Sequence, residues 1–389
     1  MKKDKIKTIL TRGVEEVIVE KNLKERLESG KKLRIKFGID PTSPDIHLGH
    51  TVVLRKLKQF QDMGHKIVLI IGEFTAQVGD PSGRDKTRPT LTAKEVKENY
   101  KNYLKQASKV IDIKKSEIRK NSEWYGKSLD KVKKGFMNVV NLTESISIQQ
   151  ILKREDFQKR LKEESSISIL ETLYPILQGY DSVEVKADVE LGGTDQKFNL
   201  LMGREVQKRF NMKEQDIITV PLIEGTDGKI KMSKSKGNYI GVSDSPRDMF
   251  GKVMSIPDNL IDKYFENLTD KNRPTKDPYE SKLSLAEEIV STYHSQGKAS
   301  KAREEFKQVF SEGNKPENME DIKIKDNINI INLLIKTGIK SKNEAKRLVE
   351  QGAIKVDDKK ITDFSKSVDI KNNQVLQVGK KKFYKLLTK

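Results

Sequence analysis

A strand, a helix and a second strand follow one another within residues 33–71, and this order constrains the fold more than any other feature of the sequence. Residues 33–39 alternate between apolar residues and polar residues or glycine, which is typical of a β-strand. After two prolines, apolar residues recur at helical spacing over residues 53–60, and the uninterrupted apolar run 67–71 predicts a buried strand. The sequence therefore predicts an α/β fold with a parallel, doubly wound sheet.

Further segments extend this plan. A strand-like piece lies far downstream at residues 217–223, and the mostly helical stretch 90–188 before it predicts an insertion. Residues 245–310 have a helical pattern. Residues 311–321 contain Gly and Pro with almost no apolar side chains, which is typical of a linker between domains.

The segment beyond the linker is small and strongly basic. Ser341 and Glu344 form an S-x-x-E capping box that predicts a short helix, and short strands are expected at residues 354–356 and 375–378. Residues 326–389 hold 15 Lys and Arg against 7 Asp and Glu, so they supply eight of the chain's 19 surplus positive charges. Clustering indicates nucleic-acid binding, whereas a lysine-rich proteome without a specific partner would spread the bias evenly.

Composition excludes several other classes of protein. The chain has no cysteine, which rules out a disulfide scaffold, a cysteine nucleophile, an iron–sulfur cluster and a thiolate zinc site. Its longest apolar run is far short of the roughly 20 residues that span a bilayer. The basic N-terminus is not followed by the apolar core of a signal peptide. We expect a soluble, cytoplasmic protein without a membrane partner.

The motif HLGH lies between the first strand and the first helix. Its two histidines, His47 and His50, are three residues apart and share a face at the helix start, where backbone amides attract phosphate. Gly49 between them lets a nucleotide approach the backbone closely. Ordinary turn histidines are the alternative. A zinc site is disfavoured because the chain has only four histidines and lacks ligands at the usual spacing.

The motif KMSKS begins at Lys231, after the second strand-like piece and a glycine-containing turn. Lys231 and Lys234 are interleaved with serines and followed by Gly237, which indicates a mobile cationic loop. Such a loop could close over a triphosphate and neutralise the charge that develops on a leaving group. A solvated basic loop is the alternative for this motif by itself.

Together, HLGH and KMSKS resemble the paired signatures of class I aminoacyl-tRNA synthetases. Four further segments narrow the resemblance to the bacterial tyrosyl-tRNA synthetases: Asp-Pro-Thr at 40–42, Gly-Asp-Pro-Ser-Gly at 79–83, Tyr-x-x-x-Gln-x-Tyr-Asp at 174–181 and Gly-Gly-Thr-Asp-Gln at 192–196. The C-terminal segment resembles the RNA-binding fold of ribosomal small-subunit protein four. The resemblance covers nearly the whole chain.

The resemblance implies three domains: a Rossmann-type catalytic domain with a helical insertion at residues 1–240, a helical domain at 241–318 and an RNA-binding domain at 319–389. It also implies that tyrosine reacts with ATP and Mg²⁺ to form tyrosyl-adenylate, and that tyrosine then passes to the terminal adenosine of its tRNA. We expect ATP oxygens to hold Mg²⁺, with no protein metal site. The implied assembly is a homodimer on which tRNA crosses between subunits.

The tyrosine site is expected on one helix. Tyr174, Gln178 and Asp181 have the spacing i, i+4, i+7 and share a face, and Pro175 requires the helix to start near Tyr174 or to kink there. By resemblance, Asp181 accepts a hydrogen bond from the phenol of the substrate, while Tyr174, Gln178 and Asp80 hold its ammonium. A solvated polar face, and a structural turn at Asp80, are the alternatives.

The resemblance also assigns the catalytic and ATP-binding residues. Thr42, His47 and His50 stabilise the pentacovalent phosphate, and Lys231 and Lys234 hold the pyrophosphate. The other assigned residues are Asp40, Gly49, Gly193 and Ser233 on ATP, Asp195 on the ribose hydroxyls, Leu222 on adenine, and Gln196 near the amino acid. A helix N-cap for Asp195 and a plain core leucine for Leu222 are the alternatives.

One position departs from the family pattern. Some members carry a second phenol-recognising tyrosine where this chain has Lys36, which leaves an opening for another aromatic amino acid. The nearest alternative is the tryptophanyl enzyme, although it usually lacks the C-terminal RNA-binding unit. An RNA-binding protein on an inactive nucleotide fold is an alternative of another class, and the intact HLGH and KMSKS motifs disfavour it. Tyrosine-dependent pyrophosphate exchange distinguishes all three.

Overall fold

The structure is a computed structural model of the chain. It describes residues 2–78, 92–126, 140, 143, 146–310, 319–324, 327–339, 341–365, 367–379 and 382–388. These residues form two compact units, the first spanning Met1–Ala302 and the second Arg303–Lys389. Among the described residues, no helix is both long and apolar enough to cross a membrane.

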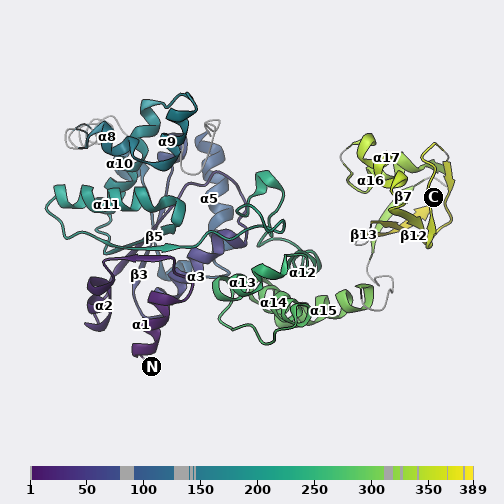
Figure 1. The fold of residues 1–389 in the computed structure, drawn as a ribbon, viewed down its shortest axis with the longest axis horizontal. Coiled ribbons are helices and arrows are strands. Elements are labelled where there is room, and N and C mark those ends of the chain that lie inside the picture. The colour runs from purple at the N-terminus through teal and green to yellow at the C-terminus, as the bar shows by residue number, and fades with distance from the viewer. Residues whose placement is uncertain are drawn as a thin grey trace. The chain divides into compact units, whose positions relative to one another are not determined.

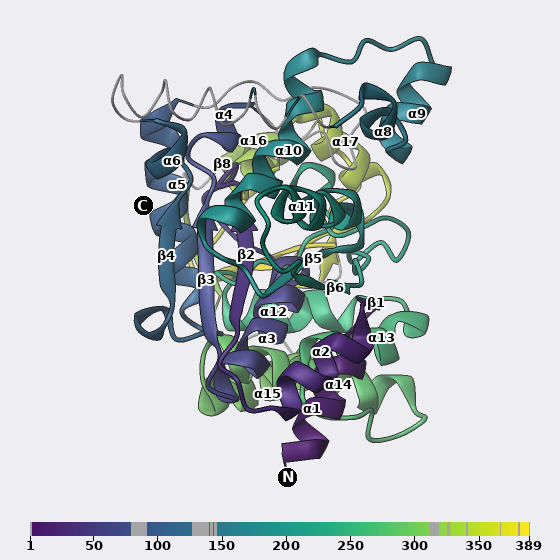
Figure 2. The same cartoon turned by 90° about the vertical axis from the view of Figure 1, so that its left-hand side faces the viewer.

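A six-stranded sheet forms the centre of the first unit, and Figure 2 shows it with strand β4 at the left and β1 at the right. Its spatial order is β1-β6-β5-β2-β3-β4. The strands are β1 (Glu16–Ile18), β2 (Arg34–Ile39), β3 (Lys66–Ile71), β4 (Glu117–Lys120), β5 (Val189–Gly193) and β6 (Asp216–Val220). Only the edge strand β1 is antiparallel to its neighbour. The predicted α/β fold with a parallel sheet is confirmed.

The order of strands reverses between β2 and β5. From β2 the chain continues to β3 and β4 on one side, whereas β5 and β6 lie on the other. In open α/β sheets, ligands bind outside the carboxyl ends of the strands at such a switch point. The HLGH motif follows β2, and the Gly-Gly-Thr-Asp-Gln segment begins at the end of β5. Both therefore lie at this switch point.

Helices cover both faces of the sheet. The described helices of this part of the chain are α1 (Lys2–Thr11), α2 (Glu20–Glu28), α3 (Leu48–Asp62), α4 (Thr75–Val78), α5 (Ala93–Ala107), α6 (Ser122–Tyr125), α8 (Ile148–Leu152), α9 (Glu155–Lys162), α10 (Ile169–Glu184) and α11 (Lys197–Arg209). In Figure 1, α10 and α11 lie above the sheet, while α1 and α2 lie below it. Val68 and Ile70 of β3 pack with α10 and α11 in one buried cluster.

Helix α10 carries the predicted tyrosine-binding face and begins earlier than the proline suggests. Ser168 caps it and forms a capping box with Glu171, so the helix starts five residues before Tyr174. Pro175 lies inside the helix. Of the two expected alternatives, a start near Tyr174 or a kink there, the first is wrong, because the cap stabilises a first turn ahead of the proline.

The first unit continues into a helical segment. Its helices are α12 (Pro246–Met254), α13 (Ile261–Leu268), α14 (Pro278–Tyr293) and α15 (Gln296–Phe310), the last of which crosses the boundary between the units. Leu283, Leu285, Ile289 and Val290 of α14 are fully buried, as the pattern predicts. Helices α12 and α14 pack against each other, and contact between α13 and α3 joins this segment to the sheet-bearing part.

The second unit is a small α+β fold. Its five-stranded sheet has the order β10-β9-β12-β13-β7 and a separate pair is formed by β11 and β8. The strands are β7 (Glu320–Ile324), β8 (Asn327–Asn329), β9 (Ile354–Val356), β10 (Lys359–Lys360), β11 (Ser367–Asp369), β12 (Gln374–Val378) and β13 (Lys382–Thr388), and the helices are α16 (Ile330–Lys336) and α17 (Lys342–Glu350). Ser341 caps α17 by accepting a hydrogen bond from the Glu344 amide. Strand β7 begins inside the stretch expected to be linker, because it pairs with β13 from the far end of the chain.

Candidate active site

The two signature motifs meet at the switch point. His47 is the N-cap of α3 and forms an isolated β-bridge with Gly241, and the Leu48 amide donates to the Ile240 carbonyl at 2.9 Å. This segment lies only a few residues beyond KMSKS. A Cβ placed on Gly49 would lie 3.7 Å from the Cβ of Met232. The tertiary structure therefore puts HLGH directly against the KMSKS loop.

The two histidines are neutral at pH 7. Desolvation by burial lowers the pKa of His47 to about 2, and the positive charges of His50, Lys234 and Lys231 add to that effect. Burial also lowers the pKa of His50, to about 4; the Lys234 charge adds to this effect, and the hydrogen bond from the His47 amide opposes it. The His47 amide donates to Nδ1 of His50 at 3.2 Å, so the ring proton of neutral His50 is on Nε2. That N–H is a hydrogen-bond donor.

Both signature lysines are held by carboxylates. Lys231 Nζ lies 2.9 Å from Asp195 Oδ2, and Lys234 Nζ lies 2.6 Å from Asp45 Oδ2. The Ser233 amide donates to Asn238 Oδ1 at 2.8 Å, which fixes the loop between the two lysines. Asp195 thus belongs to the same cluster as KMSKS, although 36 residues of chain separate it from Lys231.

Gly193, Asp195 and Leu222 also converge. A Cβ on Gly193 would lie 2.7 Å from Asp195 Oδ1 and 3.0 Å from Leu222 Cδ2, so no larger residue fits there without moving one of them. Leu222 lies just beyond β6, which ends at Val220, and it is half-buried. The carboxylate and the apolar side chain are therefore neighbours beside an open backbone.

Tyr174 is linked to the loop after β2. Its hydroxyl donates to Asp40 Oδ2 at 2.9 Å, and Thr75 donates to Asp40 Oδ1 at 2.8 Å. The Thr42 amide donates to the Asp40 carbonyl at 2.7 Å. Asp40 therefore connects the residue assigned to the substrate ammonium with a residue assigned to the phosphate. The assigned Asp80 lies outside the described residues.

Asp181 belongs to α10, and its side chain is buried. Trp124 Nε1 donates to its Oδ1 at 2.9 Å. Burial raises the pKa of Asp181 to about 7, and the Lys36 ammonium and the Trp124 hydrogen bond oppose that rise. Near neutral pH this carboxyl is therefore divided between its protonated and ionised forms.

Gln178 and Gln196 share one partner. Asn199 Nδ2 donates to Gln178 Oε1 and to Gln196 Oε1, each at 3.0 Å. Gln178 Nε2 in turn donates to Glu190 Oε1 at 3.1 Å. Two glutamines assigned to the amino-acid site are thus oriented by Asn199 of α11 and Glu190 of β5.

Comparisons with known proteins agree with this geometry. Residues 28–314 match the family described as tRNA synthetases class I (W and Y), and residues 305–386 match the Tyrosine--tRNA ligase SYY-like C-terminal domain. The first family includes tryptophan and tyrosine enzymes, so it does not separate the two. The tyrosine–tRNA ligase of Thermotoga maritima is 48% identical over 97% of this chain and 96% of that protein, and the Francisella tularensis ligase is 45% identical over 98% of both.

The chain belongs to the tyrosine–tRNA ligase family. Its predicted enzyme class, an aminoacyl-tRNA synthetase of class I, is confirmed, and so is its function as a tyrosine–tRNA ligase that uses ATP. A solved structure, the tyrosyl-tRNA synthetase from Archaeoglobus fulgidus complexed with L-tyrosine, has the same fold, with a TM-score of 0.63 and 22% identity over 78% of this chain and 99% of that one.

Several residues of this tyrosine–tRNA ligase site lie outside the sequence motifs. Asn199, Trp124 and Glu190 each bond directly to an assigned residue, yet none lies in an expected motif. Glu190 had a visible signal, a charged residue between the apolar Val189 and Leu191 of a buried strand. Asn199 and Trp124 had none, because only the packing of α11 and α6 brings them to α10.

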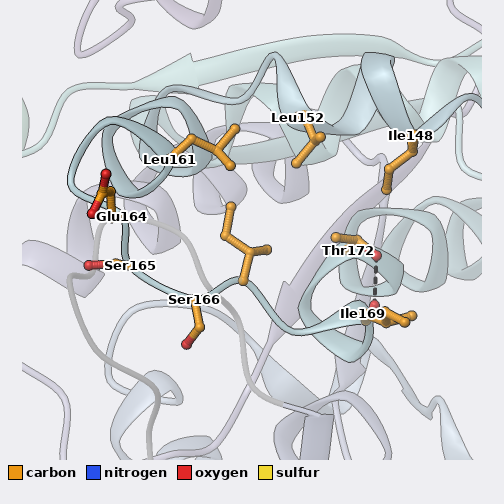
Figure 3. A pocket seen from close by; sticks show the side chains of 9 residues that line it. Ile148, Leu152, Leu161, Glu164, Ser165, Ser166, Ile169 and Thr172 are labelled. Atoms are coloured by element: carbon orange, nitrogen blue, oxygen red, sulfur yellow. Dashed lines mark hydrogen bonds between the residues drawn. The ribbon is translucent and has the colours of Figure 1, made fainter.

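One hollow in the described part of the ligase lies away from this site. It has a volume of about 720 Å³ and is lined by residues of α8, α9 and the start of α10. Figure 3 shows Ile148, Leu152, Leu161 and Ile169 around it. None of the assigned site residues that the structure describes lines it. Its apolar character does not suit ATP or the charged groups of an amino acid.

Proposed function

We propose that both steps of tyrosine–tRNA ligation take place at the carboxyl ends of β2 and β5. In the first step an oxygen of the tyrosine carboxylate bonds to the α-phosphorus of ATP, and pyrophosphate leaves. In the second step a ribose hydroxyl of the terminal adenosine attacks the acyl carbon, and AMP leaves. The first step needs no general base because the carboxylate is already a nucleophile, so catalysis rests on positioning and charge stabilisation.

The contact between HLGH and KMSKS carries this proposal. Thr42, His47 and His50 stabilise the charge on the transferring phosphoryl group, with the neutral histidines as hydrogen-bond donors. Lys231 and Lys234 hold the departing pyrophosphate. Each lysine exchanges its present carboxylate partner for phosphate oxygens when ATP binds.

The remaining ATP contacts surround the two glycines. Gly49 and Gly193 admit the phosphates and the ribose close to the backbone, and Asp195, freed from Lys231, accepts hydrogen bonds from the ribose hydroxyls. The other assigned contacts are Asp40, Leu222 on the adenine and Ser233 in the signature loop. The half-buried position of Leu222 beside Gly193 supports its contact with adenine.

Mg²⁺ is proposed to enter with ATP. The donors gathered around the phosphate position are lysines and histidines, and the carboxylates of Asp45 and Asp195 are each paired with a lysine. This set of residues suits a metal ion held mainly by phosphate oxygens and water, which Mg²⁺ prefers. There it would neutralise charge on the β- and γ-phosphates.

Tyrosine is proposed to lie along α10. Asp181 accepts the hydrogen bond of the phenol, and Tyr174, Gln178 and Asp80 bind the ammonium, with Gln196 near the amino acid. The buried position of Asp181 supports the first role, because phenylalanine would leave a buried carboxylate without its partner. Strong rejection of a substrate analogue that lacks the hydroxyl is the expected result, and tyrosine enzymes of this family are themselves the standard example of it.

The proposed domains are a catalytic domain at 1–240, a helical domain at 241–318 and an RNA-binding domain at 319–389. The C-terminal RNA-binding domain is proposed to bind the tRNA. Its surplus of eight positive charges supports this role. We also propose a cytoplasmic location, where tRNA is charged.

A homodimer is proposed through the apolar face beside the hollow. Ile169 is 81% exposed, and Ile148, Leu161 and Leu170 are each about half exposed. A contiguous apolar patch of this kind is unusual on a surface that faces water. A second copy would cover it.

Pyrophosphate exchange tests the proposed substrate. Tyrosine should support rapid ATP–pyrophosphate exchange, whereas tryptophan and phenylalanine should support little. Equal exchange with tryptophan would contradict the tyrosine assignment, and no exchange with any of the three would contradict an active nucleotide site.

A further inference from the structure

A buried ion pair joins β2 and β5 beneath the predicted tyrosine site. Lys36 and Glu190 are both fully buried, and Lys36 Nζ lies 2.8 Å from Glu190 Oε1. A single buried charge is costly, so each of these residues depends on the other for its place in the core. The pair lies on the sheet face covered by α10, because Lys36 is in register with Val68, which packs against that helix.

Both members of the pair bond to α10 or its neighbours. Lys36 Nζ donates to the Gln178 carbonyl at 2.8 Å and to Ser182 Oγ at 2.6 Å, so all three of its protons have acceptors. Glu190 Oε2 accepts from Ser182 Oγ at 3.1 Å and from the Gln215 side chain. The ion pair therefore fixes the stretch of α10 that carries Gln178.

Glu190 decides which way the Gln178 amide faces. An ionised carboxylate only accepts hydrogen bonds, so the side chain of Gln178 must turn its Nε2 toward Glu190 Oε1, at 3.1 Å. Its Oε1 then faces the opposite way, where Asn199 Nδ2 donates to it at 3.0 Å. A carbonyl oxygen has two acceptor positions, so Gln178 Oε1 retains one for a further donor.

We propose that Lys36 and Glu190 act as a positioning pair that orients Gln178 Oε1 as an acceptor for the ammonium of the amino-acid substrate. The inference rests on the proposed function, in which Gln178 binds that ammonium. Lys36 neutralises the charge of Glu190, and Glu190 fixes the orientation of the Gln178 amide. Lys36 thus serves amino-acid recognition from the core without touching the substrate.

Glu190→Met tests the orientation with a side chain of similar length. It removes Glu190 Oε1, the oxygen to which both Lys36 Nζ and Gln178 Nε2 donate. The Gln178 amide then loses the acceptor that holds its Nε2, and its Oε1 is no longer held toward the substrate ammonium. Affinity for tyrosine should fall by about 10- to 100-fold, the value of a hydrogen bond to a charged group.

Desamino-tyrosine, which has the phenol and the carboxylate but no ammonium, is the decisive comparison. Its affinity should not fall in Glu190→Met, because the amide orientation matters only to an ammonium. Equilibrium dialysis gives both affinities on the full chain. Equal losses for tyrosine and desamino-tyrosine, or no loss for either, would overturn the proposal and leave the pair a purely structural one.

The double variant Lys36→Met/Glu190→Met separates orientation from stability. It removes both buried charges, so the melting temperature should recover compared with Lys36→Met alone. The selective loss of tyrosine affinity should remain. If tyrosine affinity recovers together with the melting temperature, the pair acts through folding and the proposal fails.

Lys56→Met is the matched control. Lys56 is also a buried lysine, but its Nζ donates to the carbonyls of Ile9 and Arg12, away from α10. It should lower the melting temperature and leave the ratio of the two affinities unchanged; a changed ratio would show that any lost buried lysine disturbs the site, and would contradict the proposal. Wild-type protein that fails to prefer tyrosine over desamino-tyrosine would instead contradict the proposed ammonium site of the parent function.

Discussion

Lys231 and Asp195 form an ion pair, with 2.9 Å between Nζ and Oδ2, although they are assigned to opposite ends of the ribose-triphosphate. The lysine is 45% exposed and the carboxylate 23%, so water screens their attraction. Exposed pairs of this kind contribute about 0–1 kcal/mol. ATP can therefore replace both partners at small cost, and the pair holds the KMSKS loop in place until it does.

Lys231→Ala and Lys234→Ala should each slow adenylate formation by about 10²-fold or more, because each removes one charge contact made to the leaving pyrophosphate. Single-turnover pyrophosphate release measures the rate, and equilibrium dialysis measures tyrosine affinity, which should hardly change. Lys229→Ala, an exposed lysine of the same loop with no assigned role, is the control. A comparable loss of tyrosine affinity would contradict the assignment.

Asp181→Ala should reduce kcat/KM for tyrosine far more than for phenylalanine, because the carboxylate is assigned to the phenol alone. Tyrosine- and phenylalanine-dependent pyrophosphate exchange gives both values. Tyr174→Phe, which alters the ammonium side of the site, should reduce kcat/KM for both amino acids to a similar extent. If Asp181→Ala retains the wild-type preference for tyrosine, the specificity belongs to another group.

Asp181→Asn should stabilise the fold increasingly as pH rises from about 4 to 7. The folded-state pKa of Asp181 is about 7, above its ordinary value of 3.8, so the folded state binds more protons over this range. The contribution of Asp181 to the free energy of unfolding of the wild type is fully present below about pH 4 and is lost as the pH rises through 7. Urea unfolding at pH 5, 6, 7 and 8 measures the difference, and a pH-independent difference would contradict the raised pKa.

Removal of residues 311–389 should separate the two steps of the reaction. The deleted part includes the basic C-terminal unit and none of the residues assigned to ATP or tyrosine, so pyrophosphate exchange should persist. Transfer to tRNA should fall sharply, and tRNA affinity should depend less on salt, since each lost phosphate contact flattens that dependence. A truncated protein that charges tRNA at the full rate would refute the tRNA-binding role, and one that folds but loses exchange would assign the tail to the catalytic core.

Ile169→Glu should convert the proposed dimer to monomer, because it places a charge within the exposed apolar patch. Sedimentation velocity measures the oligomeric state. Leu201→Glu alters an exposed leucine of α11 outside the patch and should leave the dimer intact. A wild-type protein that sediments as a monomer at micromolar concentration would remove the basis for the dimer.

The sequence by itself determined the local elements and the family. The strand–helix–strand pattern of residues 33–71 correctly predicted β2, α3 and β3, because hydrophobic periodicity is a local property. The signature motifs were recognisable for a similar reason, since the residues of each lie within a few positions of one another. The cap at Ser341 was predictable for the same reason, whereas the start of α10 was not, because Ser168 and Pro175 gave competing signals.

Only the tertiary structure decided which distant residues share a site. The alternation in β2 gave Lys36 the appearance of a polar surface residue, yet it is fully buried because Glu190, on a strand adjacent in space but distant in sequence, neutralises it. The bridge from His47 to Gly241 and the bonds from Asn199 to two glutamines have the same origin. Strand order and helix packing set these contacts, and neither is encoded in the periodicity of any single segment.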